Sequence, residues 1–228
     1  MSRALLSQSG VRFGTIGGMR REENRAEVTA AILASARRQV ADKGGGALSM
    51  REVARDVGMV SSAVFRYFAT KEALLTAMVI ESFGRVAQRV SAPGVAGDWR
   101  AMAHALRGWA LEAPHEFQLI YGTPIPGYQA PTETIPAAAS VAGPFLAVAA
   151  TGAPSPVPEE LSDDFAAMTR AVPGSTVESN AAAVAELAQL IGYITLELSG
   201  HMVGVVTDVD AHFDWLVGRQ VRTLGLDN

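Results

Sequence analysis

One segment of the sequence is best suited to bind another molecule: residues 49–75, which read SMREVARDVGMVSSAVFRYFATKEALL. Small residues lie in the middle of this segment, and Arg66 and Tyr67 follow about one helical turn later. Small side chains let a helix lie close to base edges, while Arg and Tyr can reach bases or phosphates. The chemistry indicated is nucleic-acid recognition. The candidate DNA contacts are Arg25, Ser49, Arg51, Ser61, Ser62, Ala63, Arg66, Tyr67 and Lys71.

Two short helices joined by a tight turn must position these side chains. Ser49 is the predicted N-cap of the first helix, with Glu52 at the capping-box position, and Gly58 ends this helix. The second helix is predicted over residues 61–67. A small apolar core would fix the crossing of the two helices, and its members are Val53, Ala54, Val57, Met59, Val64 and Phe68. This is the helix-turn-helix pattern, whose second helix enters the major groove.

A further helix follows directly, capped by Thr70 and running from Lys71 to about Val90. At its start, Lys71 would offer a phosphate its ammonium group and the free N–H groups of the first helical turn. Pro93 and Gly94 then break the chain.

An amphipathic helix is predicted upstream, over residues 23–43. Its apolar positions recur every four residues, at Val28, Ile32, Ala36 and Val40. Three glycines beginning at Gly44 end the pattern. Residues 1–22 are predicted to form a disordered arm, and Met19, directly before the helical pattern, is an alternative start. A basic arm that touches DNA is the functional alternative.

The formal net charge of −4 is divided unequally along the chain. Residues 1–92 carry 14 Lys and Arg against 8 Asp and Glu, a net of +6, and residues 93–228 carry 5 against 15, a net of −10. This asymmetry is expected when only the N-terminal part meets an anionic polymer, although chance clustering of solvated charges would give the same count.

The rest of the chain keeps a helical pattern. Helices are predicted over residues 99–113, 114–121, 135–150, 159–171, 177–206 and 210–224. No segment shows the sustained alternation of β-branched residues that is typical of strands, so the predicted fold class is all-α. The helix over 177–206 is apolar enough for a membrane span, but Glu186, Gln189, Glu197 and His201 would be costly in a bilayer. We therefore expect a buried or inter-subunit helix and no membrane partner.

The helix-turn-helix segment resembles the DNA-binding signature of the tetracycline-repressor (TetR) family. The matching residues are Gly58, Val64, Phe65, Tyr67, Phe68, Thr70, Lys71, Glu72 and Leu74. Two positions depart from the family pattern. Val60 stands where the family usually places a Ser or Thr cap, so Ser61 would cap the recognition helix one residue later. Phe65 replaces a usual tyrosine, and we interpret it as a packing residue.

The C-terminal part is similar to a subgroup of the same family that is named for a Trp–His–Gly motif, over residues 115–124 and 190–201. Of that triplet, Gly192 alone is obvious here. The resemblance implies a homodimer whose last two helices form a four-helix bundle. Apolar residues at helical spacing fit such a seam or the monomer core: Leu187, Ile191, Ile194, Leu198, Met202 and Val205. Three small residues would let helices approach closely: Ala188, Gly192 and Gly204.

The resemblance also implies a small-molecule pocket in the C-terminal domain. Candidate lining residues are Trp99, Met102, Trp109, Phe117, Tyr121, Tyr128, Phe145, Phe165, Met168, Tyr193 and His201, each of which could instead belong to the plain core. Few basic residues lie in this part, so an apolar or cationic ligand fits better than a polyanion. The histidine spacing matches no metal motif, and no catalytic motif is present, so we expect no metal, no cofactor and no catalytic residue.

The predicted organisation has four parts: the arm over 1–22, a three-helix helix-turn-helix DNA-binding domain over 23–70, a connecting helix over 71–92 and a larger helical ligand-binding and dimerisation domain over 93–228. The predicted function is that of a cytoplasmic, homodimeric transcriptional repressor that a small-molecule effector releases from a palindromic double-stranded operator. The alternatives are an activator or a ligand-independent regulator with the same fold. A small all-α enzyme is the rival from another class, and the missing catalytic constellation argues against it.

Overall fold

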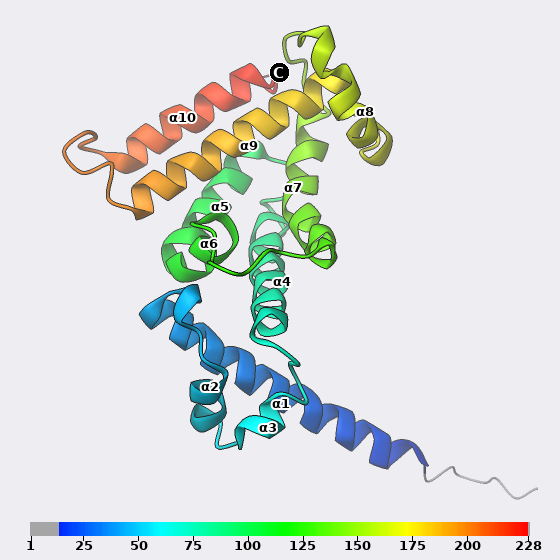
Figure 1. Cartoon of the computed structure of the whole chain (residues 1–228). Coiled ribbons are helices and arrows are strands. Elements are labelled where there is room, and N and C mark those ends of the chain that lie inside the picture. The colour runs from blue at the N-terminus through cyan, green and yellow to red at the C-terminus, as the bar shows by residue number, and fades with distance from the viewer. Residues whose placement is uncertain (1–13, 228) are drawn as a thin grey trace, which may run out of the picture.

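The computed structural model describes residues 14–227, with side chains from residue 21 onward. Within that range the chain has ten α-helices and no strand, which confirms the predicted all-α fold. Figure 1 shows a small N-terminal part and a larger C-terminal part joined by one long helix, α4 (Lys71–Val90).

The small part consists of α1 (Gly14–Lys43), α2 (Met50–Asp56) and α3 (Ser61–Val64), packed around the first turns of α4. Its core contains buried side chains from all four helices: Ile32, Ala36, Val53, Ala54, Val64, Leu74, Leu75 and Met78, joined by Phe68 just after α3. Val57 and Met59 pack against this core from partly buried positions. The small core predicted for the helix-turn-helix is therefore confirmed.

Helix α1 begins earlier than the sequence pattern predicts. Residues 14–22 are helical, although we expected them to belong to a disordered arm. Extending an existing helix needs no new nucleation, so a long amphipathic helix can continue into a segment with poorer helix formers. The remainder of the predicted arm, residues 1–13, lies outside the described residues.

The start of α2 has the predicted cap, but not the predicted capping box. The Ser49 hydroxyl accepts a hydrogen bond from the Glu52 backbone N–H at 3.4 Å. The Glu52 carboxylate instead pairs with Lys43 Nζ at 2.8 Å, and the Ser49 N–H donates to Gln39 Oε1 at 3.1 Å. The predicted reciprocal bond, from the Ser49 N–H to the Glu52 side chain, is therefore wrong, because Gln39 of α1 accepts from that N–H instead.

Helix α3 is shorter than expected and begins at Ser61, with Val60 in the N-cap position and no side-chain cap. The predicted shift of the cap to Ser61 is therefore wrong. By contrast, Thr70 caps α4 as predicted, because its hydroxyl accepts from the Ala73 N–H at 3.1 Å.

The larger part contains six further helices: α5 (Trp99–Glu112), α6 (Pro114–Tyr121), α7 (Ile135–Ala149), α8 (Ser162–Ala171), α9 (Val177–Leu198) and α10 (Val209–Thr223). Helices α9 and α10 lie side by side across the end that is farthest from α2 and α3 (Figure 1). The upper half of α4 packs against α5 and α7. The connecting helix is thus part of both hydrophobic cores.

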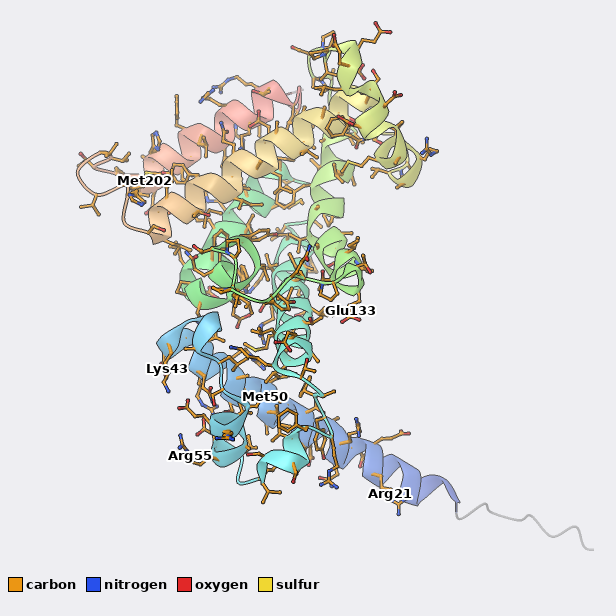
Figure 2. The ribbon with its side chains drawn as sticks, in the orientation of Figure 1. Arg21, Lys43, Met50, Arg55, Glu133 and Met202 are labelled. Atoms are coloured by element: carbon orange, nitrogen blue, oxygen red, sulfur yellow. The ribbon has the colours of Figure 1, made fainter. Side chains whose placement is uncertain are left out.

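Helix α9 ends at Leu198, not near Val206 as predicted. Gly200 and Gly204 adopt left-handed conformations, with φ of 77° and 78°, which an α-helix cannot contain. Met202 and Val205 therefore lie in the loop between α9 and α10 and are not part of a helical seam (Figure 2).

The two parts touch through the loop after α6. Ile125 packs so closely on Gly45, in the turn between α1 and α2, that a Cβ at position 45 would overlap its Cδ1 atom. Three residues farther on, the Tyr128 hydroxyl is 3.1 Å from the Thr76 hydroxyl on α4. These contacts fix the small part against the large one.

Candidate nucleic-acid interface and effector site

The exposed surface of α3 carries the predicted recognition residues, with one correction. Ser62 and Arg66 are exposed, and Ser61 is half-buried. Ala63 is only 7% exposed, because this face of the four-residue helix turns inward, so it is not available to DNA. Ser61, Ser62 and Arg66 therefore remain at least partly accessible to DNA.

The residues that flank α3 expose two apolar side chains. Phe65 is 46% exposed and Val60 is 70% exposed, so the interpretation of Phe65 as a packing residue is wrong. The short helix gives Phe65 no neighbour to cover it. Exposed apolar side chains here are suited to contact thymine methyl groups in a major groove.

Tyr67 is held by a contact from α1. The Arg25 guanidinium lies 5.2 Å from the centre of the Tyr67 ring, within cation–π range. The ring is half-buried and also packs against the N-terminal core. The structure thus places two predicted DNA contacts, Arg25 and Tyr67, side by side. Each side chain also holds the other in position.

Lys71 and Ser49 already have partners within the protein. Lys71 Nζ donates to the Gly46 carbonyl at 2.8 Å, and the Thr70 cap occupies the Ala73 N–H of the first turn. The Ser49 hydroxyl caps α2. A phosphate contact from Lys71 would have to compete with the turn between α1 and α2.

The exposed arginines on α2 and in the turn after α3 have no such partners. Arg51 and Arg55 are one helical turn apart on α2 and are exposed together with Arg66. None of the three lies within ion-pair distance of a carboxylate in the side chains described. Arg55 points outward at the tip of the small part in Figure 2. This leaves an uncompensated positive surface where the helix-turn-helix would meet DNA.

Most predicted ligand residues are core residues. Six of them are at most 7% exposed and belong to one hydrophobic cluster: Trp99, Met102, Trp109, Phe117, Phe145 and Tyr193. Trp109, Phe117 and Tyr121 lie next to one another as tilted aromatic neighbours. Burial raises the pKa of Tyr121 to about 12, so its hydroxyl stays neutral.

The other predicted ligand residues do not join this group. Phe165 and Met168 are half-buried on α8, and His201 is exposed in the loop after α9. Tyr128 is bonded to Thr76 at the junction of the two parts. The structure therefore does not gather the eleven candidates around one central cavity.

Two partly buried ionic clusters lie in or beside the large part. In one, Arg107 donates to both carboxylate oxygens of Glu197, at 2.8 and 2.6 Å, and lies 2.7 Å from Asp210. Hydrogen bonds to Glu197 raise the pKa of Arg107 above its ordinary value, with a smaller contribution from Asp210. This cluster joins α5 to α9 and to the start of α10.

The second cluster connects the two parts of the protein. Glu116 on α6 accepts from Arg85 Nε at 2.8 Å and from the Ser82 hydroxyl at 3.1 Å. Arg85 also lies 3.6 Å from Glu81, which accepts from Arg37 of α1 at 3.2 Å. A chain of charges therefore runs from α6 through α4 to α1.

A cavity of about 370 Å³ adjoins this second cluster. It is formed by α4, α5 and the first turn of α6, and is lined by Arg85, Gln88, Arg89, Trp109, Glu112, Ala113 and Glu116. Trp109 is the one predicted ligand residue on its wall.

Comparison with known protein families now decides the assignment. Residues 32–78 match the model described as bacterial regulatory proteins, tetR family. Residues 99–220, more than half of the chain, match the model described as the tetracyclin repressor-like C-terminal domain. This chain belongs to the TetR family.

Relatives of this TetR-family protein include the HTH-type transcriptional regulators Mb1846 of Mycobacterium bovis and Rv1816 of Mycobacterium tuberculosis. Each is 39% identical over 141 residues, a match that covers 58% of this chain and 60% of the relative. Thus the match spans less than two thirds of the relatives' length.

Solved structures share the fold. The crystal structure of the protein SCO4313 has a TM-score of 0.78 and 29% identity, covering 89% of this chain and 98% of that one. NalD of Pseudomonas aeruginosa, the secondary repressor of the MexAB-OprM multidrug efflux pump, has a TM-score of 0.53 and 18% identity, covering 89% and 99%. The latter likeness shows the fold alone.

Sequence reasoning missed two groups of residues in this TetR-family protein. Arg55 shares the exposed side of α2 with Arg51, and its spacing of four from Arg51 was the available signal. Arg85 and Glu116 are 31 residues apart, and nothing in their local sequence indicates that they meet.

Proposed function

We propose that this TetR-family protein is a dimeric transcriptional repressor that binds a palindromic operator in the cytoplasm and releases it when a small molecule binds the C-terminal domain. The observation that carries the proposal is the unpaired positive surface of Arg51, Arg55 and Arg66 around the exposed Ser62. Arginines without acidic partners are free to bind phosphates and base edges, and Ser62 is small enough to let the helix approach.

Dimerisation is supported by an uncovered face of α9. Four of its exposed residues follow helical spacing, and three of these are small: Ala185, Ala188, Gly192 and Leu196. Close packing of a second helix needs such residues. On the neighbouring α10, Trp215 is 54% exposed and is a further uncovered apolar side chain. We assign this face to a second copy of the chain.

The dimer assignment is tested by Gly192→Leu. A Cβ at Gly192 would meet no atom of the monomer within 4 Å, and the position is exposed, so we expect leucine to disturb a closely packed partner more than the isolated chain. We expect sedimentation to show a shift from dimer to monomer. Ala139→Leu, an exposed position on α7, is the control and should leave the dimer intact. An unchanged dimer in Gly192→Leu would contradict the assignment.

Regulation by a ligand is supported by the position of α4. This helix starts beside the recognition helix and ends within the C-terminal core, so a change in the packing of its upper half can move its lower half. Two such α4 helices in a dimer would change the separation of the recognition helices. Ligand and DNA must then weaken each other's binding reciprocally.

The proposal is tested by selecting DNA that the full chain retains from a random pool. We expect a pair of inverted half-sites whose centres are one helical turn or more apart, matching the two-fold symmetry of a dimer. Fluorescence anisotropy should show much tighter binding to the selected DNA than to random DNA at the same salt concentration. Retention of all sequences alike would contradict the proposal.

A further inference from the structure

One phenylalanine of the helix-turn-helix is left uncovered by the protein. Phe65 is 46% exposed, and it is the one exposed phenylalanine among the side chains that the structure describes. Phe68, three residues later, is only 8% exposed and belongs to the core of the small part. A single exposed apolar side chain is common on protein surfaces, so its neighbours must decide whether it has a role.

The neighbours of Phe65 place it on the outer side of α3. Its backbone is helical, and its N–H donates to the Ser61 carbonyl at 3.3 Å, so the helical turn continues through residue 65. Ser62 lies three residues before Phe65 and four before Arg66, a spacing that brings side chains together on one face of a helix. All three are exposed, whereas the two residues between Ser62 and Phe65 are buried. Phe65 therefore shares its face with Ser62 and Arg66.

The charge around this face favours DNA as the molecule that covers it. Arg51, Arg55 and Arg66 are exposed and lie beyond ion-pair distance of every carboxylate in the side chains described. An uncompensated positive surface attracts a polyanion and repels a second copy of itself. Residues 32–78, which include this face, match the bacterial regulatory protein model of the tetR family.

The major groove of DNA offers a phenyl ring one kind of apolar group. The base edges there present hydrogen-bond donors and acceptors, and thymine alone adds a methyl group at C5. A ring placed over a donor or acceptor removes its water and returns no hydrogen bond, which is unfavourable. A ring placed over a methyl group buries two apolar surfaces, which is favourable.

We propose that Phe65 is a specificity-determining residue that recognises a thymine in each operator half-site through the thymine methyl group. Phe65 has no hydrogen-bonding group in its side chain, so it distinguishes bases by apolar contact, whereas Arg66 on the same face distinguishes them by hydrogen bonds. The inference rests on the proposed function only in requiring a selected operator, and it needs neither repression nor an effector.

The test removes one methyl group from the DNA. An operator is first selected from a random pool with the full chain, and each thymine retained in one half-site is then replaced in turn by deoxyuridine. Deoxyuridine pairs like thymidine but lacks the C5 methyl. Fluorescence anisotropy at constant salt measures the affinity of each duplex. We expect at least one replacement to weaken binding about fourfold, the effect of losing one buried methyl group.

Three variants assign that methyl group to Phe65. Phe65→Ala should lower operator affinity about tenfold, leave affinity for random DNA unchanged, and respond to the same deoxyuridine by less than twofold. Phe65→Leu keeps an apolar side chain and should still respond. Leu111→Ala, at a 47% exposed position on α5, is the matched control and should respond like the parent. Comparing parent and Phe65→Ala on both duplexes isolates the contact between ring and methyl group.

Several results would overturn this assignment. One is an operator in which no deoxyuridine replacement weakens binding, and another is an equal response of the parent and Phe65→Ala. A third is equal weakening of operator and random DNA by Phe65→Ala, which would place the ring on the sugar–phosphate backbone. Urea denaturation checks that Phe65→Ala is folded. Failure to select any sequence contradicts the proposed function instead, so the two failures are distinguishable.

Discussion

Three arginines at one end of this molecule and one arginine in the large part are used in opposite ways. At the tip of the small part, Arg51, Arg55 and Arg66 are exposed and without carboxylate partners. In the large part, Arg107 is 9% exposed and is held by two carboxylates. The net charges of the two parts suggest only a difference in the number of basic and acidic residues. The structure shows a difference in pairing, which decides whether a cation is available to another molecule or has a role within the fold.

Among the substitutions that test this comparison, we expect the largest effect at the buried Arg107. Arg107→Ala leaves the Glu197 side chain, 12% exposed, without its cation, and should lower the free energy of unfolding by about 3 kcal/mol. Urea denaturation at a fixed protomer concentration measures it. Arg170→Ala, at an exposed position on α8, is the matched control and should change stability little.

A double variant sharpens this result. Arg107→Leu with Glu197→Leu removes both charges, and apolar replacements of a buried pair often recover most of the lost stability. Equal losses in Arg107→Ala and Arg170→Ala would show that burial does not distinguish these arginines.

The next largest effect is expected at the exposed end. Arg66→Ala should lower operator affinity by about tenfold to a hundredfold and relax preference at one base position, with unfolding unchanged. Anisotropy titrations with single-base variants of the selected operator measure both. If affinity and preference stayed as they are, Arg66 would have no role in base recognition.

A smaller, sequence-independent effect is expected for Arg55. Arg55→Ala should weaken operator and random DNA alike, and reduce the slope of log affinity against log salt by about one per lost phosphate contact. Lys71→Ala provides the contrast, because its nitrogen already donates to Gly46. If Lys71→Ala has the larger effect on the slope, this bond must open on DNA.

The smallest predicted effect concerns the half-buried carboxylate of Glu186 on α9. Burial raises the pKa of Glu186 above its ordinary value, with a partly opposing effect of Arg219. A raised pKa in the folded state favours the protonated form, so this contribution is present at acid pH and lost as pH rises through the folded value. Glu186→Gln should therefore be slightly more stable than the parent at neutral pH, and the difference should vanish in acid. Denaturation at both pH values measures it, and a constant difference would contradict the shift.

Local signals in the sequence were sufficient to predict two N-caps of the small part. Ser49 and Thr70 cap the helices that follow them, because an N-cap bond involves residues only three apart. The capping box at Glu52 failed for the opposite reason, since its competitor Gln39 comes from another helix. Phe65 was misjudged because a four-residue helix provides too few neighbours to bury it.

The effector region could not be predicted in the same way. An aromatic residue at helical spacing is compatible with a packed core or with a pocket wall, and Phe117 and Trp109 have the same signature in the sequence. What distinguishes them is that Trp109 lines a cavity, which depends on three helices meeting. The charge chain from Arg37 to Glu116 is equally nonlocal, because its members are up to 44 residues from their partners.

The close seat of Ile125 on Gly45 makes the two parts of this protein a matched pair instead of interchangeable modules. A chimaeric regulator that joins this C-terminal domain to another DNA-binding head would keep this contact most simply with glycine at position 45. A larger residue there would require the end of the Ile125 side chain to move aside. Transplanting both positions together, or replacing residue 125 with alanine, would let such a fusion form without that movement.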